Sequence, residues 1–347
     1  MQKLTIISLF FILSGCFSGP LYESNLSFNA EEVVLKENLI LISPPVSFAV
    51  LSDQSILVIT ESQQIIRFSP DGYQVQVIDN IGQGELEVYT PSLVRAYDDG
   101  FLIWCQDLLK MVEYNSNGQP IKAYFGFDHA IKDFEVEKNA IYTYISSLPG
   151  KPFVQVYDKI SQKIAQSLGN AEKGQILTNL NACAGGMASS GSSLIFVPSH
   201  ALELYQANIN RIEEVKVTFL EHPAFKKIEF DADPVELINS DQMKAFGYGM
   251  ENGLVTGIFS IEDKFLITGE VGEIKLTGAG LETNERKRFL MLLDSELSAE
   301  GLSFEDFDPA QSCRLYASGN DYLGRIIQKE GESEFTYVFE KLYPKKN

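Results

Sequence analysis

Few residues of this sequence stand at a spacing that predicts catalysis. The three histidines, His129, His200 and His222, are far apart, and none has a serine or aspartate at a spacing that suggests a catalytic base. No Gly-x-Ser-x-Gly turn occurs, which would present a nucleophilic serine. We therefore interpret the histidines as loop or rim residues, and the sequence favours a binding module over an enzyme.

Oxygen-bearing side chains offer a second kind of chemistry, because carboxylate and amide oxygens are the ligands that Ca²⁺ prefers. Five of them fall where we expect innermost strands to start: Glu87, Asp133, Asn181, Glu251 and Asp306. If these side chains converge on a central channel, they could hold a calcium ion for the hydrolysis of a lactone or an ester. The alternative is that they are solvated acids in a chain with 47 Asp and Glu. No other cofactor is indicated, since CxxC and HxxxH spacings are absent.

Aromatic residues in loop-like segments are the candidates for ligand contact. Five residues belong to this set: Tyr89, His129, Phe225, Phe246 and Tyr248. Three of them fall in an insertion over residues 220–250 that could cap a concave mouth suited to a peptide, a glycan or an envelope protein. The alternative is that these rings pack between structural units.

The elements that must position these residues are short β-strands in a repeating unit. Residues 48–78 contain four apolar runs joined by turns, and residues 92–125 repeat the arrangement. The turns ending at Gly72 and Gly118 are 46 residues apart, a period expected of a propeller blade. A third unit spans residues 131–168, and later units use residues 193–205, 254–294 and 304–339. The period predicts an all-β, six-bladed β-propeller of four-stranded antiparallel blades, in which residues 32–35 complete the last blade. A β-sandwich or two smaller β domains are the alternatives.

The first sixteen residues predict export. Lys3 precedes an apolar run over residues 4–13, which is too short to span a bilayer, and small residues follow. The quartet Leu13-Ser14-Gly15-Cys16 resembles the lipobox of bacterial lipoproteins. This resemblance implies cleavage before Cys16 and acylation of Cys16, with palmitate-type chains that anchor the protein in a membrane. Phe17 follows the cysteine in place of the aspartate associated with inner-membrane retention, which favours the outer membrane; its periplasmic or surface face stays open. The expected organisation is a signal peptide over residues 1–15, a lipidated tether over 16–28 and a propeller over 29–347. A plain secretory signal is the alternative.

A longer motif lies between the first two units. Gly82, Gly84, Glu87 and Pro91 precede an Asp99-Gly100 turn and an Asn115–Gly118 turn. This order resembles the blade entry of bacterial six-bladed propeller lipoproteins related to NHL-repeat and TolB-like propellers. The resemblance implies a cell-envelope address and a ring fold, but no single activity.

Composition limits the remaining function classes. The chain has 347 residues, 28 Lys and Arg against 47 Asp and Glu, and a net charge of -19, so its surface repels nucleic acid. Hydrophobic residues make up 45% of it, enough for a globular core. Cys105 lies in an apolar run and is expected in the core, while a Cys183–Cys313 disulfide is left open.

Overall fold

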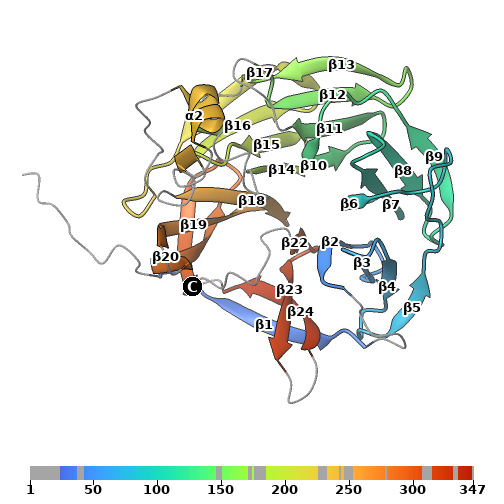
Figure 1. Ribbon diagram of the computed structural model, residues 1–347, viewed down its shortest axis with the longest axis horizontal. Coiled ribbons are helices and arrows are strands. Elements are labelled where there is room, and N and C mark those ends of the chain that lie inside the picture. Colours follow the sequence, from blue (N-terminus) through green and yellow to red (C-terminus); the bar gives the residue numbers. More distant parts are fainter. Residues whose placement is uncertain are drawn as a thin grey trace, which may run out of the picture.

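The fold consists almost entirely of antiparallel β-sheet. The computed structural model describes residues 24–36, 43–145, 151–170, 174–175, 185–225, 233–241, 244–245, 253–277, 280–306, 315–330 and 335–345. Within these ranges lie six four-stranded sheets arranged in a ring, so the predicted six-bladed β-propeller is confirmed (Figure 1).

Each blade is a meander of four strands that runs from the axis outward. Blade 1 contains β2 (Pro45–Val50), β3 (Ile56–Thr60), β4 (Ile65–Phe68) and β5 (Gln74–Val77). Blade 2 contains β6 (Pro91–Tyr97), β7 (Gly100–Cys105), β8 (Lys110–Tyr114) and β9 (Pro120–Tyr124). Blade 3 contains β10 (Ile131–Val136), β11 (Ala140–Ile145), β12 (Val154–Asp158) and β13 (Lys163–Leu168). These three blades follow the sequence-based assignment closely.

The other three blades depart further from the sequence pattern. Blade 4 contains β14 (Gly186–Ser190), β15 (Ser193–Val197), β16 (Glu203–Asn208) and β17 (Arg211–Phe219). Blade 5 contains β18 (Leu254–Ile261), β19 (Lys264–Thr277), β20 (Gly280–Leu293) and β21 (Ala299–Asp306). Blade 6 contains β22 (Tyr316–Ser318), β23 (Leu323–Glu330), β24 (Phe335–Pro344) and β1 (Phe28–Val34). The assignment of residues 304–306 to the last blade is wrong, because they end the outermost strand of blade 5.

The first strand of the chain closes the ring. β1 pairs antiparallel with β24, and Val33 lies opposite Phe339 in the register. Gly72, in the turn that ends blade 1's third strand, packs against Val34 of β1. Strands from the N-terminal and C-terminal parts of the described residues are therefore joined in one blade, which confirms the predicted role of residues 32–35 and protects the edge of β24.

Apolar layers between neighbouring blades form the core. Side chains alternate along each strand, so Leu57 and Ile59 of β3 face blade 2, while Ile56 and Val58 face blade 6. Six separate clusters of buried residues result, one at each of the six junctions between blades. Because both faces of each sheet are buried, the inner strands are continuous apolar runs such as ILVIT in β3.

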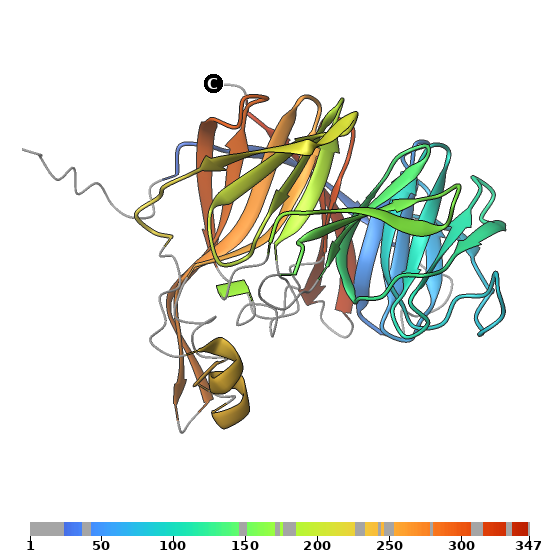
Figure 2. The same cartoon turned by 90° about the horizontal axis from the view of Figure 1, so that it is seen from above.

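The ring has two different faces. Short turns join the first and second strands of each blade on one side, which we call the tight-turn face. The opposite side, which we call the long-loop face, carries helix α2 (Pro234–Ser240) and the far end of the long β19–β20 hairpin (Figure 2). Asp233 caps α2 by accepting hydrogen bonds from the N–H groups of Val235 and Glu236. The helix belongs to the segment that the sequence predicted as an insertion.

Candidate functional site: the propeller axis

The six innermost strands meet around the axis, each with one edge that has no neighbouring strand in its own sheet. Side chains of adjacent blades satisfy part of this edge. Ser47 Oγ accepts from the N–H of Val94 at 3.2 Å, and Ser318 Oγ accepts from the N–H of Ser260 at 3.2 Å. Hydroxyl groups in otherwise apolar strands therefore hold neighbouring blades together at the centre.

A cavity of about 150 Å³ occupies the axis on the side of the tight-turn face. All six innermost strands contribute to its wall, and Ala96, which lines it, is exposed. Its apolar lining includes Phe48, Met187, Ile258 and Phe259. Its polar side chains are Arg95, Glu135, Ser189, Ser260 and Ser318. A water molecule needs roughly 10–15 Å³ of such volume, so the cavity admits several waters or one small organic molecule.

The charged side chains of the axis come from two blades and bind a third. Asp133 on β10 forms an ion pair with Arg95 on β6 and accepts from the N–H of Met187 on β14 at 3.0 Å. Asp133 also accepts from the N–H of Phe134 at 2.8 Å. Both carboxylate oxygens of Asp133 are thus engaged, and this buried group links blades 2, 3 and 4.

Glu135 lies two residues further along β10 and reaches the same neighbouring blade. Its Oε2 accepts from Ser189 Oγ at 2.9 Å, and its side chain lines the cavity. Burial raises the pKa of Glu135 to about 7; the positive charge of Arg95 opposes this shift and the negative charge of Asp133 adds to it. A carboxylate with such a pKa changes its charge near neutral pH.

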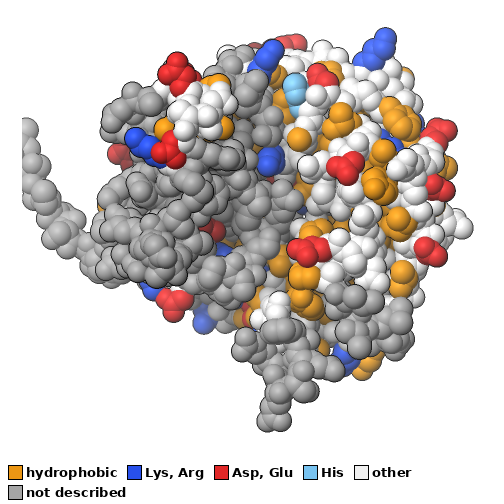
Figure 3. All heavy atoms as spheres, in the orientation of Figure 1, with side chains coloured by type: hydrophobic (Ala, Val, Ile, Leu, Met, Phe, Trp, Pro, Cys, Tyr) orange, Lys and Arg blue, Asp and Glu red, His pale blue; other side chains and the backbone are white. Residues whose placement is uncertain are grey.

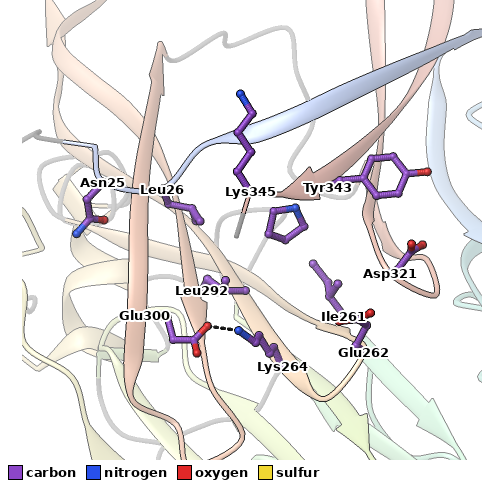
Figure 4. A pocket seen from close by; sticks show the side chains of 11 residues that line it. Asn25, Leu26, Ile261, Glu262, Lys264, Leu292, Glu300, Asp321, Tyr343 and Lys345 are labelled. Atoms are coloured by element: carbon purple, nitrogen blue, oxygen red, sulfur yellow. Dashed lines mark hydrogen bonds and ion pairs between the residues drawn. The ribbon is translucent and has the colours of Figure 1, made fainter. Parts of the chain in front are cut away.

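A second, larger groove of about 560 Å³ lies on the tight-turn face between blades 5 and 6. Lys264 and Glu300 form an ion pair on one wall, and Asp321 and Tyr343 lie across from them (Figure 4). Leu26 also lines it. Beside this groove, the N–H of Leu26 donates to the carbonyl of Leu302 at 3.0 Å, so the groove borders the place where the N-terminal segment joins β21.

The predicted calcium ligands do not converge among the described residues. Glu87 accepts from the N–H of Gly84 at 2.8 Å, in the loop before β6. Asp306 lies at the end of the outermost strand of blade 5, not at the start of an innermost strand, and pairs with Lys287. Asp133 is the one member on the axis. Asn181 and Glu251 lie outside the described residues. Over the described ranges, no group of three His, Cys, Asp or Glu could hold a metal ion.

The predicted aromatic contacts are likewise dispersed. Tyr89 is half-buried in the loop before β6. The side chain of His129 faces its neighbour in the chain, with Nε2 3.7 Å from Asp128 Oδ1. Phe225 packs edge-on against Phe289, with ring centroids 6.2 Å apart. Phe225 therefore follows the packing alternative, while Phe246 and Tyr248 lie outside the described residues. Seen from the long-loop face, the described surface of blades 1 to 3 shows hydrophobic side chains scattered among polar and acidic ones (Figure 3).

The other two histidines have structural partners. His200 is buried beside Gln175, with Nδ1 3.4 Å from Oε1, and Gln175 donates to the hydroxyl of Tyr144 at 2.9 Å. His222 Nδ1 accepts from the N–H of Ala224 at 3.1 Å, and burial lowers the pKa of His222. Both histidines therefore fix loops around blade 4.

The glycine motif before blade 2 forms a loop held by a buried lysine. Lys110 on β8 donates through Nζ to the carbonyls of Gly84 at 2.6 Å and Glu85 at 3.2 Å. A Cβ on Gly82 would lie 2.0 Å from Glu87 Oε2, so a glycine lets this carboxylate close the loop. The motif thus has a structural role that its spacing alone did not disclose.

Cys105 is completely buried on β7, as predicted, and burial raises the pKa of its thiol to about 11. Cys16, Cys183 and Cys313 lie outside the described residues. No helix in the described part of the chain has the length and apolar character needed to cross a membrane.

Comparisons with known proteins agree on the fold. No family model matches the sequence, and no curated protein matches it. A member of the DUF4221 family from Bacteroides vulgatus is similar in structure, with a TM-score of 0.67 and 13% identity, over 94% of this chain and 100% of that one. A protein from Bacteroides fragilis, whose name marks it as a candidate exported protein, has a TM-score of 0.58 and 11% identity, over 92% and 96%. The WD40 repeats of RRP9 give a TM-score of 0.54 and 10% identity, over 91% and 100%.

The protein is therefore a six-bladed β-propeller with an axial cavity of mixed charged, polar and apolar lining, and its similarity to these structures extends over nearly the whole chain. At these identities the similarity concerns the fold alone, because one fold serves many functions.

Proposed function

We propose that this protein is an exported, lipid-anchored binding protein of the bacterial cell envelope, in the manner of NHL-repeat and TolB-like propeller lipoproteins. Its ligand site is the axial cavity, and its anchor is the acylated Cys16. The observation that carries the binding role is that all six innermost strands line one cavity in which Arg95, Glu135 and serine hydroxyls converge. Sites of this kind, with apolar walls and a few polar groups, suit small-molecule binding.

The N-terminal contacts support the anchoring arrangement. The main chain of Asn25 and Leu26 donates to Leu302, and Ser24 Oγ accepts from the N–H of Phe304 at 2.9 Å. The chain is thus bound to blade 5 from Ser24 onward. Eight residue steps separate Cys16 from Ser24, which allows a reach of up to about 28 Å. Such a tether keeps the propeller close to an outer-membrane surface.

Labelling of cells with radioactive palmitate tests the anchor. The full-length chain should incorporate the label and sediment with outer membranes, whereas Cys16→Ala should incorporate none. Cys105→Ala is the matched control. Because Cys105 is buried in the core, its replacement should leave palmitate labelling unchanged. Equal labelling of the wild type and Cys16→Ala would refute lipidation at Cys16.

The calcium-dependent lactonase or esterase stays a second proposal with less support. Asp133 is the one predicted calcium ligand that the structure places on the axis, and both of its carboxylate oxygens already bind Arg95 and two backbone N–H groups. We expect excess calcium to leave the melting temperature of the propeller unchanged relative to chelator. A calcium-dependent rise would revive this proposal, because a ligand of the folded state must raise that temperature.

A further inference from the structure

The charges of the axial cavity do not balance. Arg95 contributes one positive charge, and Asp133 and Glu135 contribute one negative charge each, so the ionised group carries +1 - 2 = -1. Arg95 is committed to Asp133, and its Nη1 donates to the carbonyl of Val94 at 3.2 Å. Glu135 is therefore the carboxylate that an incoming cation would neutralise.

Glu135 also has an oxygen available for a ligand. Its Oε2 is bound by Ser189, whereas no group of the described residues donates a hydrogen bond to Oε1. The residue is only half-buried and lines the cavity, so a molecule in the cavity can reach it. A carboxylate in this position accepts strong, charge-assisted hydrogen bonds from a cationic donor.

The remaining lining indicates which cation fits. The hydroxyls of Ser189, Ser260 and Ser318 add acceptors for N–H donors. Ala96, which is exposed, and Phe259 supply apolar wall. A calcium ion would require six to eight oxygen ligands, which one carboxylate and a few hydroxyls do not provide. A cavity of about 150 Å³ is the size that holds benzene in an engineered protein, so about six heavy atoms can enter.

We propose that the axial cavity binds a small primary alkylammonium ion, with its ammonium group against Glu135 and the serine hydroxyls and its alkyl chain against the apolar wall. This inference rests on the proposed binding function and names its ligand class. The ion pair between Arg95 and Asp133 then serves to hold blades 2, 3 and 4 in place around the site.

Calorimetric titration with n-butylammonium chloride tests the proposal, using the protein without residues 1–15 and with Cys16→Ser so that it stays in solution. We expect saturable binding at pH 8 and at least tenfold weaker binding by Glu135→Gln. 1-Butanol has the same size without the charge. Tetramethylammonium has as many heavy atoms as n-butylammonium and carries the charge without an N–H donor. Neither should bind. Asp306→Asn, which removes a carboxylate far out on blade 5, is the matched control and should bind as the wild type does.

The pH dependence gives a second readout. Because the pKa of Glu135 is about 7, about a tenth of it is ionised at pH 6, so affinity should fall roughly tenfold from its high-pH limit. Three charged groups act on Glu135: Arg95 on β6, Asp133 on β10 and Glu137 directly after β10. The cavity-lining residues of β2, β14, β18 and β22 carry no charge.

Three results would overturn the proposal: no binding of n-butylammonium up to about 50 mM, equal binding of 1-butanol, or equal binding by Glu135→Gln. The melting temperature of Glu135→Gln without ligand shows whether the variant folds. If Cys16 is labelled with palmitate while n-butylammonium fails to bind, the ligand class is wrong and the anchored protein stands. If Cys16 is not labelled while n-butylammonium binds, the anchor is wrong and the cavity assignment stands.

Discussion

Replacement of Asp133 by alanine tests whether the charged group at the axis holds three blades together. Asp133 is 6% exposed and receives hydrogen bonds from Arg95, from the N–H of Met187 and from the N–H of Phe134. Asp133→Ala leaves a guanidinium without its counter-charge and two backbone donors without an acceptor. Removing one partner of a buried ion pair typically lowers the free energy of unfolding by about 3–5 kcal/mol.

This cost converts into a shift of the melting temperature. The unfolding entropy is about 2.1 cal/mol/K per residue, or about 0.7 kcal/mol/K for roughly 320 residues of propeller. A loss of about 3–5 kcal/mol therefore lowers the melting temperature by about 4–7 °C. Differential scanning calorimetry measures it directly.

Two further variants make the test specific. Asp306→Ala removes an ion pair whose carboxylate is 93% exposed, and it should leave the melting temperature unchanged. Arg95→Met should also destabilise the protein, and the double variant of Arg95 and Asp133 should lose less than the sum of the single losses. If Asp133→Ala melts within about 1 °C of the wild type, the axial charges do not hold the blades and this reasoning is wrong.

Three other perturbations follow from the structure. The folded-state pKa of Glu135, about 7, exceeds its ordinary value of 4.5, so the contribution of this carboxyl group to stability is present at low pH and is lost as pH rises through about 7. In unfolding titrations, the free energy of unfolding of Glu135→Gln should exceed that of the wild type by on the order of 1–3 kcal/mol at pH 8 and by little at pH 5. An equal change at both pH values would contradict this. Gly72→Ala places a Cβ 2.1 Å from the carbonyl oxygen of Val34, at a position with a φ of +82°. Gly191 has a φ of +57° and open space around it, so Gly72→Ala should melt at a temperature well below that of Gly191→Ala. Similar melting temperatures of the two variants would argue against the packing at the ring closure. Cys105 should resist iodoacetamide at pH 8 in the folded protein and react once guanidinium unfolds it, as peptide mapping would report, and rapid labelling of the native state would contradict its burial.

The sequence predicted the number of blades and the strands of the first three blades. Turns with glycine at residues 72 and 118, at a fixed offset, defined the first two blades, because turn chemistry and strand alternation are local properties. The pattern weakened after residue 168. Gly186–Ser190 lacks a strand pattern, because its residues are mostly small and none is β-branched, and the sequence pattern places residues 304–306 one blade too late.

The axial site was decided by the tertiary structure. The sequence predicts a site role for Asp133 but not for Arg95, Glu135 or Ser189. A charged residue within an otherwise apolar strand is the signal that points to Arg95 and Glu135. Periodicity predicts which face of a sheet a side chain occupies. It does not predict which side chains of different blades meet, because that depends on the curvature of the ring. The curvature is set by six apolar layers, each between two neighbouring blades, so Arg95, Asp133 and Ser189 come together only when blades 2, 3 and 4 have packed side by side.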